Sequence, residues 1–155
     1  METAPLSKWF SRSFAAVSAV GFLDALYLTV EHYLNQGTAC FLVSGCDRVL
    51  ESQYAMLAPN VPIALAGVLY YGTLLGLAIA YLRTRNHDTF RFAAMGTVVG
   101  LLASFYFIYL QFFVIKAICI YCMLSAVTSL TLFVLGLIAF SKLRSAATAS
   151  QDAAR

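Results

Sequence analysis

The chain contains four cysteines, and they form two close pairs. Cys40 and Cys46 make up the first pair, and Cys119 and Cys122 make up the second. Paired thiols can form a structural disulfide, exchange electrons with another dithiol, or bind a soft metal ion such as Zn²⁺. The spacing alone leaves these three kinds of chemistry open, so the choice depends on where the rest of the chain places the thiols.

The composition predicts that lipid surrounds most of the chain. Of the 155 residues, 61% are hydrophobic and 11% are charged, whereas about 25% of the residues in a soluble domain are charged. A helix needs about 20 apolar residues to span a bilayer, and stretches of this kind cover residues 14–33, 62–82, 92–114 and 119–140. We therefore predict an all-α fold, an integral membrane four-transmembrane-helix bundle over residues 1–143. The polar segment 144–155 is predicted to be a disordered cytoplasmic tail.

Basic residues are unevenly divided between the two sides of the predicted bundle. Eight of the ten lie on the side of the termini and the 83–91 loop, and only Arg48 and Lys116 lie on the other side. Because Lys and Arg are enriched in cytoplasmic loops, both termini are predicted to be cytoplasmic. Both cysteine pairs then face an oxidising compartment, the periplasm or the outside of a bacterial inner membrane. Disulfides do not ligate metal, so this placement argues against a metal site.

The loop that carries the first pair is predicted to cover the bundle. Apolar residues recur at about helical spacing between Val49 and Tyr54, with charged residues among them. This pattern predicts a short amphipathic helix on the membrane surface, which acts as an extracytoplasmic cap. Pro59 and Pro62 are expected to end this helix and to open the second spanning helix.

The second pair is predicted to lie at the start of the fourth helix, where a thiolate is favoured. Cys119 and Cys122 share a helix face, and the positive end of the helix dipole stabilises negative charge. Lys116 either reinforces this effect or anchors the helix at the membrane surface. A dithiol at the end of an apolar bundle can pass two electrons to a membrane quinone. Cys40 and Cys46 would then accept electrons from a soluble partner, although a structural loop disulfide is the alternative.

Together these motifs resemble the bacterial members of the vitamin K epoxide reductase family. The resemblance covers roughly residues 21–126, and its parts are Cys40–Tyr54, Gly67–Tyr71, Ser104–Tyr106, Phe112–Val114 and Cys119–Cys122. A single Cys-x-x-Cys motif is a weak signal, whereas two pairs in this order and topology are specific. The resemblance implies a four-helix bundle around a quinone, with the loop pair above it.

The resemblance also implies an electron path through the matching cysteines. Cys40 would meet the redox partner, and Cys46 would pass electrons inward to Cys119. Cys122 would contact the quinone, ubiquinone or menaquinone, and Ser52 would orient the cap. The expected partner is a separate thioredoxin-fold protein of the DsbA type, because no fused thioredoxin domain is expected in this chain.

Two positions depart from the pattern of the animal family members. Those members hold the quinone carbonyls with an Asn on the second helix and a Tyr one turn after the Cys-x-x-Cys motif. The matching positions here are Ile63 and Ala126, which we keep, together with Ser52, as candidate quinone contacts. This departure argues against vitamin K epoxide reduction. The predicted activity is that of a quinone-linked thiol-disulfide oxidoreductase that supports disulfide-bond formation.

Asp24 places an acidic residue inside the first spanning stretch, where an isolated charge is costly. A structural role, with the carboxyl group protonated and hydrogen-bonded inside the bundle or placed nearer its cytoplasmic end, is favoured over a functional one. Glu31 and His32 lie nearer the predicted chemistry and are candidates for the proton relay that quinone reduction requires. The tyrosines are expected to be interfacial or packing residues, with one or two lining the quinone pocket. No run of basic residues indicates nucleic-acid binding.

Two other classes of function are compatible with the same residues. Four thiolates can bind a soft metal ion in a membrane binder or transporter. Two inert disulfides can brace a purely structural bundle. Metal content would distinguish the first alternative, and loss of electron transfer in a folded Cys122 variant would exclude the second.

Overall fold

Four long helices dominate the computed structural model, which describes residues 8–34, 46–50, 52–58 and 61–152. They are α1 (Lys8–Leu34), α3 (Ile63–Thr84), α4 (His87–Tyr109) and α5 (Ile120–Asp152). The segments long and apolar enough to cross a bilayer are Trp9–Leu34, Ile63–Thr84, Asp88–Ile115 and Ile120–Lys142. The predicted all-α membrane bundle of four helices is therefore confirmed.

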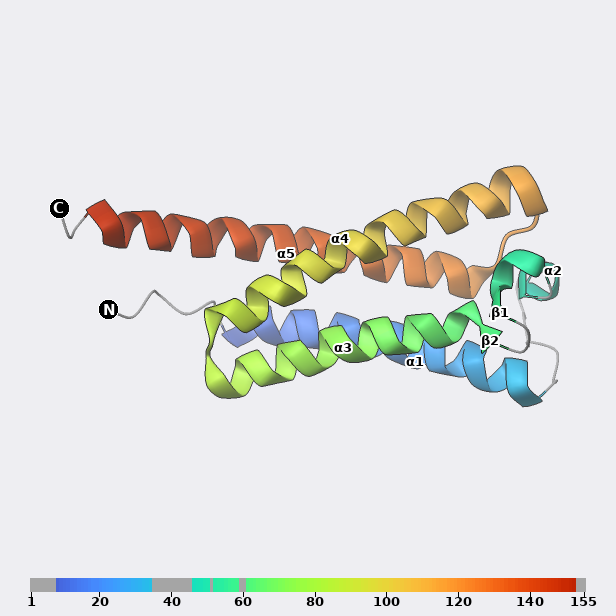
Figure 1. The fold of residues 1–155 in the computed structure, drawn as a ribbon, viewed down its shortest axis with the longest axis horizontal. Coiled ribbons are helices and arrows are strands. Elements are labelled where there is room, and N and C mark those ends of the chain that lie inside the picture. The colour runs from blue at the N-terminus through green and yellow to red at the C-terminus, as the bar shows by residue number, and fades with distance from the viewer. Residues whose placement is uncertain (1–7, 35–45, 51, 59–60, 153–155) are drawn as a thin grey trace.

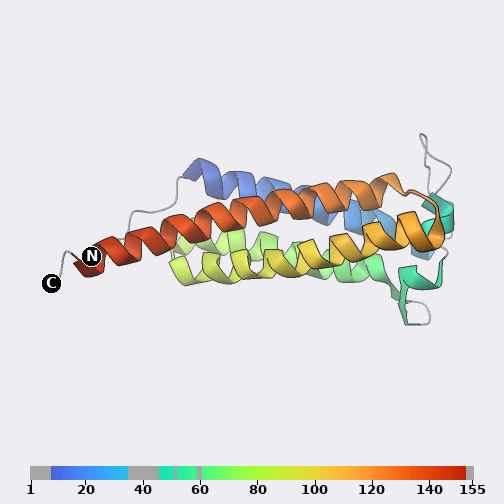
Figure 2. The same cartoon turned by 90° about the horizontal axis from the view of Figure 1, so that it is seen from above.

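The helices run up and down, so that the start of α1 and the end of α5 lie at the opposite end of the bundle from the second cysteine pair (Figures 1 and 2). α1 packs mainly against α3, and α4 packs mainly against α5. α1 also contacts α5, and α3 also contacts α4. The short helix α2 (Cys46–Leu50), the π-helical turn η2 (Leu110–Ile115) and the start of α5 meet at one end. We call this the dithiol end, and we call the opposite end, with residues 83–91, the basic end.

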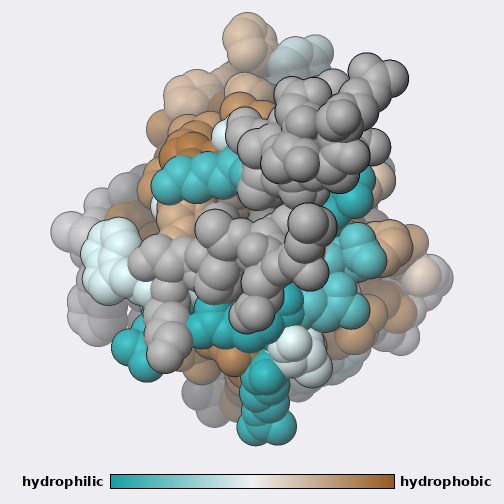
Figure 3. Space-filling view, turned by 90° about the vertical axis from the view of Figure 1, so that its left-hand side faces the viewer, coloured by the Kyte–Doolittle hydropathy of each residue, from teal (hydrophilic) through white to brown (hydrophobic). Residues whose placement is uncertain are grey.

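The turn between α3 and α4 is fixed by local hydrogen bonds at the basic end. Arg85 adopts the left-handed conformation, with φ of 55°, and its N–H donates to the Tyr81 carbonyl at 2.9 Å. The Asn86 side chain accepts a hydrogen bond from the Asp88 N–H at 3.0 Å and so caps α4. Hydrophilic residues accordingly gather on this end of the surface (Figure 3). That this end faces the cytoplasm stays a prediction.

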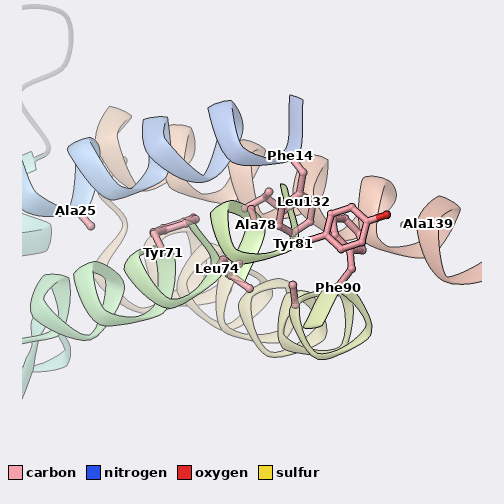
Figure 4. Packing of buried hydrophobic residues seen from close by; sticks show 10 residues of the cluster. Phe14, Ala25, Tyr71, Leu74, Ala78, Tyr81, Phe90, Leu132 and Ala139 are labelled. Carbon is pink, nitrogen blue, oxygen red and sulfur yellow. The ribbon is translucent and has the colours of Figure 1, made fainter. Parts of the chain in front are cut away.

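An aromatic cluster fills the bundle near the basic end (Figure 4). The Phe90 ring lies edge to face against Phe14 and Tyr81, with centroid separations of 5.1 and 5.0 Å. These three side chains, together with Leu132 of α5, are fully buried. Many outward-facing apolar side chains, such as Leu69, are exposed instead. This distribution is expected where lipid, rather than water, surrounds the bundle.

The loop after the first cysteine pair differs from the predicted amphipathic helix. α2 has only five residues, and it is followed by η1 (Gln53–Ala55), β1 (Met56–Ala58) and β2 (Val61–Pro62). β1 and β2 pair antiparallel. The predicted helix is therefore wrong beyond Leu50. Proline disfavours helical geometry in the residue before it, and Pro59 and Pro62 therefore hold the residues before them in extended conformations.

α5 continues beyond the membrane span as far as Asp152. The prediction of a disordered tail over 144–155 is therefore corrected to helix up to that residue. A helix that is already formed in the span extends at little cost, and alanine, which recurs in this segment, is the strongest helix former.

Candidate active site

The second cysteine pair marks the start of α5. Cys119 immediately precedes the helix, and its carbonyl accepts a hydrogen bond from the Met123 N–H at 3.1 Å. Cys122 lies in the first helical turn. Both residues are free thiols, and Cys119 is fully buried whereas Cys122 is half-buried. The dithiol therefore lies at the dithiol end of the bundle, largely shielded by the surrounding side chains.

The Cys119 thiol is poised to become the thiolate. A hydrogen bond from the Cys122 thiol lowers the pKa of Cys119 below the ordinary value of a thiol. Burial opposes this effect because a thiolate is poorly solvated in an apolar environment, and the negative charge of Asp24 opposes it further. The net direction is downward. Because the thiolate is the nucleophile in thiol–disulfide exchange, the pair is suited to that chemistry.

Gln111 holds the segment in front of the pair. Its side-chain oxygen accepts the Cys119 N–H at 2.8 Å, and its backbone carbonyl accepts the Ala117 N–H at 3.1 Å. This geometry depends on η2, the π-helical turn that ends α4, and on Lys116, which reverses the chain with φ of 54°. Single π-turns are frequent at functional sites. Gln111 is only 2% exposed, and its side-chain nitrogen donates to the Phe107 carbonyl at 3.5 Å, so both ends of the buried amide have the partners that burial demands.

The sequence analysis missed Gln111. The available signal was a single amide side chain in an otherwise aromatic and aliphatic segment, 105–115, where an unpaired polar group is expensive. Its partner, eight residues along the chain, comes within reach only through the π-helical turn and the reversal at Lys116. The Lys116 side chain itself is exposed, and its two predicted roles stay as predictions.

α2 packs directly on the dithiol. Val49 forms a small buried cluster with Ala117 and Cys119. Ser52 fixes the end of α2, because its hydroxyl donates to the Val49 carbonyl at 2.7 Å. Cys46 begins α2, one turn before Val49, so its backbone is held near the second pair. Cys40 lies outside the described residues.

A cluster of hydroxyl groups, the Tyr71 hydroxyl cluster, lies further into the bundle, one to two turns beyond Cys122. The Tyr71 hydroxyl lies 2.8 Å from the Ser125 carbonyl, 3.0 Å from Thr128 Oγ1 and 2.8 Å from Ser129 Oγ. Tyr71 is buried, and the structure thus places it in the interior packing rather than in an interfacial belt. Its hydroxyl ties α3 to α5 close to the dithiol.

The comparison with known families identifies this arrangement. Residues 12–137 match the model of the Vitamin K epoxide reductase family. The chain belongs to this family. The matched range includes all four cysteines. No match was found among the curated proteins. As a member of the vitamin K epoxide reductase family with four apolar spanning helices, the protein is an integral membrane protein and, in the broad sense, a thiol oxidoreductase.

The positions at which this family member was predicted to contact a quinone lie at or near the dithiol end. Ile63 is the first residue of α3, and Ala126 lies one turn after Cys122 in α5. Both are half-buried. Ser52, by contrast, makes its hydrogen bonds within the cap. Contact of these residues with a quinone stays a prediction.

The candidate proton-relay residues lie near the end of α1, and the described residues contain no cluster of metal ligands. Glu31 and His32 are half-buried near the end of α1. Within the described part of this family member, no group of three or more His, Cys, Asp or Glu side chains lies together to hold a metal ion. Cys40 and the side chain of Cys46 fall outside that part of the chain.

Proposed function

We propose that this protein is a quinone-linked thiol-disulfide oxidoreductase that supports disulfide-bond formation. Electrons from a thioredoxin-fold partner of the DsbA type pass through Cys40 and Cys46 to Cys119 and Cys122, and then to membrane ubiquinone or menaquinone. The observation that carries this proposal is the hydrogen-bonded dithiol at the end of a membrane bundle, with α2 packed on Cys119. Membership of the vitamin K epoxide reductase family supports it.

The transfer between the two pairs is a thiol–disulfide exchange. The Cys46 thiolate attacks Sγ of Cys119 in the oxidised pair, which breaks the Cys119–Cys122 bond and leaves Cys122 as a thiolate. Cys40 then attacks Cys46, which forms the loop disulfide and releases Cys119. The net result is one disulfide in the loop and one reduced dithiol at α5. The contact between Val49 of α2 and Cys119 supports this route.

The residues around the dithiol fit a quinone as the electron acceptor. A quinone is apolar and takes up two electrons and two protons when it is reduced. The bundle interior is mostly apolar, but it contains the carboxylate oxygens of Asp24, which have no hydrogen-bond partner among the described residues. Cys122, Ile63 and Ala126 are the residues expected to hold the quinone. The Tyr71 hydroxyl cluster joins α3 to α5 further into the bundle.

The distribution of charge supports a site that faces the periplasm or the outside. Eight of the ten Lys and Arg residues belong to the termini and the α3–α4 turn, and the described parts of these segments lie opposite the dithiol end. Under the positive-inside rule the dithiol end is extracytoplasmic. A soluble thioredoxin-fold partner in an oxidising compartment then meets the loop pair.

Quinone reduction by the purified protein in detergent, measured with two reductants, tests the proposal. A small dithiol can reduce the enzyme without Cys40, whereas a reduced thioredoxin-fold protein requires it. We expect Cys122→Ala to abolish quinone reduction with both reductants. Cys40→Ala should abolish it only with the protein reductant, and this variant therefore serves as the matched control for folding.

Two results would contradict the proposal. The first is folded native protein, with all four thiols present, that reduces neither ubiquinone nor menaquinone with either reductant. The second is a Cys122→Ala variant that reduces quinone at the native rate. Stoichiometric zinc in the purified protein, combined with the first result, would indicate the metal-binding alternative.

A further inference from the structure

Asp24 is a buried carboxyl group inside the first spanning helix. It is 7% exposed, and neither of its carboxylate oxygens has a hydrogen-bond partner among the described residues. The hydrogen bond that the sequence analysis expected for this carboxyl group is therefore not found among the described residues. An uncompensated acidic group within a membrane is costly, and such groups mark proton or ligand pathways.

A contact one turn before Asp24 fixes its depth in the bundle on one side. Gly21 of α1 lies against the Tyr71 ring so closely that an added Cβ would clash with it. The Tyr71 hydroxyl in turn lies within 3.0 Å of side-chain oxygens of Ser125, Thr128 and Ser129 of α5. Gly21 is therefore at about the level of the turn 125–129, with the Tyr71 side chain between them.

A second contact, one turn after Asp24, fixes its depth on the other side. The Tyr27 ring of α1 lies 5.1 Å from the Tyr121 ring of α5, measured between centroids. α1 and α5 run in opposite directions (Figure 1). Asp24, halfway between Gly21 and Tyr27, is therefore at a level between the turn 125–129 and Tyr121, which is the first turn of α5 that contains Cys122.

The electrostatic effect of Asp24 on the dithiol agrees with this geometry. The charge of Asp24 acts on both Cys119 and Cys122. The other titratable side chains at this level, on the helices packed against α1, are Tyr70 and Tyr71 of α3 and Tyr121 of α5. The basic residues of these two helices lie towards the basic end of the bundle and beyond it; they are Arg83, Lys142 and Arg144. No basic side chain of α3 or α5 therefore neutralises the carboxylate.

Glu31 and His32, the relay candidates from the sequence, lie further from the interior. Glu31 follows Asp24 by two helical turns, which is about 10 Å along the axis of α1. Both residues are half-buried near the end of the helix. They are therefore placed to exchange protons with water, whereas Asp24 lies in the interior at the level of the first turn of α5.

We propose that Asp24 is the proton acceptor of the dithiol, an inference that rests on the proposed function and extends it. As the Cys119–Cys122 bond forms, two electrons pass to the quinone and both S–H bonds are lost. The proton of Cys122 moves to the Asp24 carboxylate and then to a quinone oxygen. The proton of Cys119 leaves to the aqueous side, and the second quinone oxygen takes one proton from there. The dithiol therefore releases two protons, and the quinone takes up two.

A spectroscopic titration tests the link between Asp24 and the thiols without any quinone. The ultraviolet absorbance of the thiolate is followed against pH in the reduced full chain, with Cys40→Ser and Cys46→Ser so that only the dithiol contributes. Removing the negative charge with Asp24→Asn should lower the midpoint of Cys119 by on the order of one pH unit. Asp88→Asn removes an exposed carboxylate at the basic end and should leave the midpoint unchanged.

Quinone reduction with a small dithiol, in chains that keep all four cysteines, is the second readout. General acid–base catalysis contributes about 10²–10⁴-fold, so Asp24→Asn should reduce turnover by at least about tenfold. Asp24→Glu, which keeps a carboxyl group, should recover part of the loss, and Asp88→Asn should turn over at the native rate. Asp24→Ser replaces Asp24→Asn in both readouts if the latter does not fold.

The thiol midpoint and the turnover of the Asp24 variants together decide whether Asp24 accepts the proton. A lower thiol midpoint together with lower turnover supports it. An unchanged midpoint overturns it, because a merely structural Asp24 would leave the midpoint where it is. A lower midpoint with native turnover also overturns it, because the proton then takes another route. Native protein without turnover would refute the proposed function, and the titration would still judge whether Asp24 and the dithiol are coupled.

Discussion

At the basic end of the bundle, Phe14, Tyr81 and Phe90 pack ring against ring around Leu132, in regular helices that end with ordinary caps. At the dithiol end, α4 passes into a π-helical turn, the chain reverses through a left-handed residue, and a short helix packs on a buried thiol. The first region consists of regular helices packed through apolar rings, whereas the second interrupts its helices and holds the buried Cys119 through the Gln111 side chain and α2.

This difference indicates that the two ends of the bundle have different roles. Regular packing at the basic end fixes how the four helices are arranged. The irregular backbone at the dithiol end places thiols and amides in positions that an uninterrupted helix would not allow. Departures from local rules of this kind are expected where a protein carries out chemistry. The predictions that follow test whether stability and electron transfer are indeed separable between the two ends.

The largest expected effect is on stability, at the basic end. Phe90→Ala removes a fully buried ring and should lower the free energy of unfolding by about 3–5 kcal/mol. Turnover per folded molecule should stay near the native value. Phe92→Ala, which removes a ring that is 67% exposed, should change stability by only about 0.5 kcal/mol. Reversible denaturation in detergent measures both, and equal losses for the two variants would contradict the account.

At the dithiol end the expected effect is on both stability and turnover. Gln111→Leu leaves the buried Cys119 N–H without its acceptor, which should cost about 1–3 kcal/mol. Because a displacement of about 1 Å can cost a hundredfold in rate, quinone reduction should fall more than stability does. Gln53→Leu, at an exposed position of η1, is the control for the loss of an amide. A Gln111→Leu variant with native turnover would show that the Gln111 hydrogen bond does not position the dithiol.

Two glycine-to-alanine substitutions compare the stability of the protein at a crowded helix position and at an open one. An added Cβ at Gly21 would clash with the Tyr71 ring, whereas one at Gly76 would meet nothing within 4 Å. Gly21→Ala should therefore destabilise the protein by about 1–3 kcal/mol. Gly76→Ala should stabilise it by about 0.5–1 kcal/mol, because alanine has the better helix propensity. Thermal unfolding of the two variants in the same detergent checks the opposite signs, and a shared sign would contradict this packing.

The smallest expected effect is a shift in the titration of one thiol. The hydrogen bond from Cys122 lowers the pKa of Cys119, and burial raises it. Cys122→Ala removes the donor and leaves the opposing influences, so Cys119 should form its thiolate at higher pH than in the native pair. Cys122→Ser keeps a donor and should retain most of the lowering. Thiolate absorbance in chains with Cys40→Ser and Cys46→Ser measures both midpoints, and identical midpoints would contradict the assigned cause.

Much of the fold could be predicted from the sequence, because each spanning helix needs only a long apolar run. The start of α5 at the Cys-x-x-Cys motif also followed from the sequence. The loop helix was overextended, because an apolar pattern of one or two turns does not distinguish a helix from an irregular cap. The extension of α5 was missed, because the segment after Leu143 has no apolar stripe to suggest a packed helix.

The candidate site could be predicted only where its residues are reactive by type. The four cysteines could be identified from the sequence because thiols are reactive. The family resemblance then implies the order in which they pass electrons. Gln111 and Tyr71 act through hydrogen bonds to α5 and its approach, and such partners become visible only when the helices are packed. Asp24 was seen in the sequence but was given a hydrogen-bonded role, since its lack of a partner is a property of the three-dimensional structure.

The central claim is that the loop pair delivers electrons to the buried dithiol through Cys46 and Cys119. The most direct measurement is mass spectrometry of the oxidised full chain in which only these two cysteines remain, with Cys40→Ser and Cys122→Ser. We predict a Cys46–Cys119 disulfide within single molecules. The matched chain that keeps only Cys40 and Cys119 should form little or none. Two free thiols in the first chain, or equal cross-linking in both, would contradict the account.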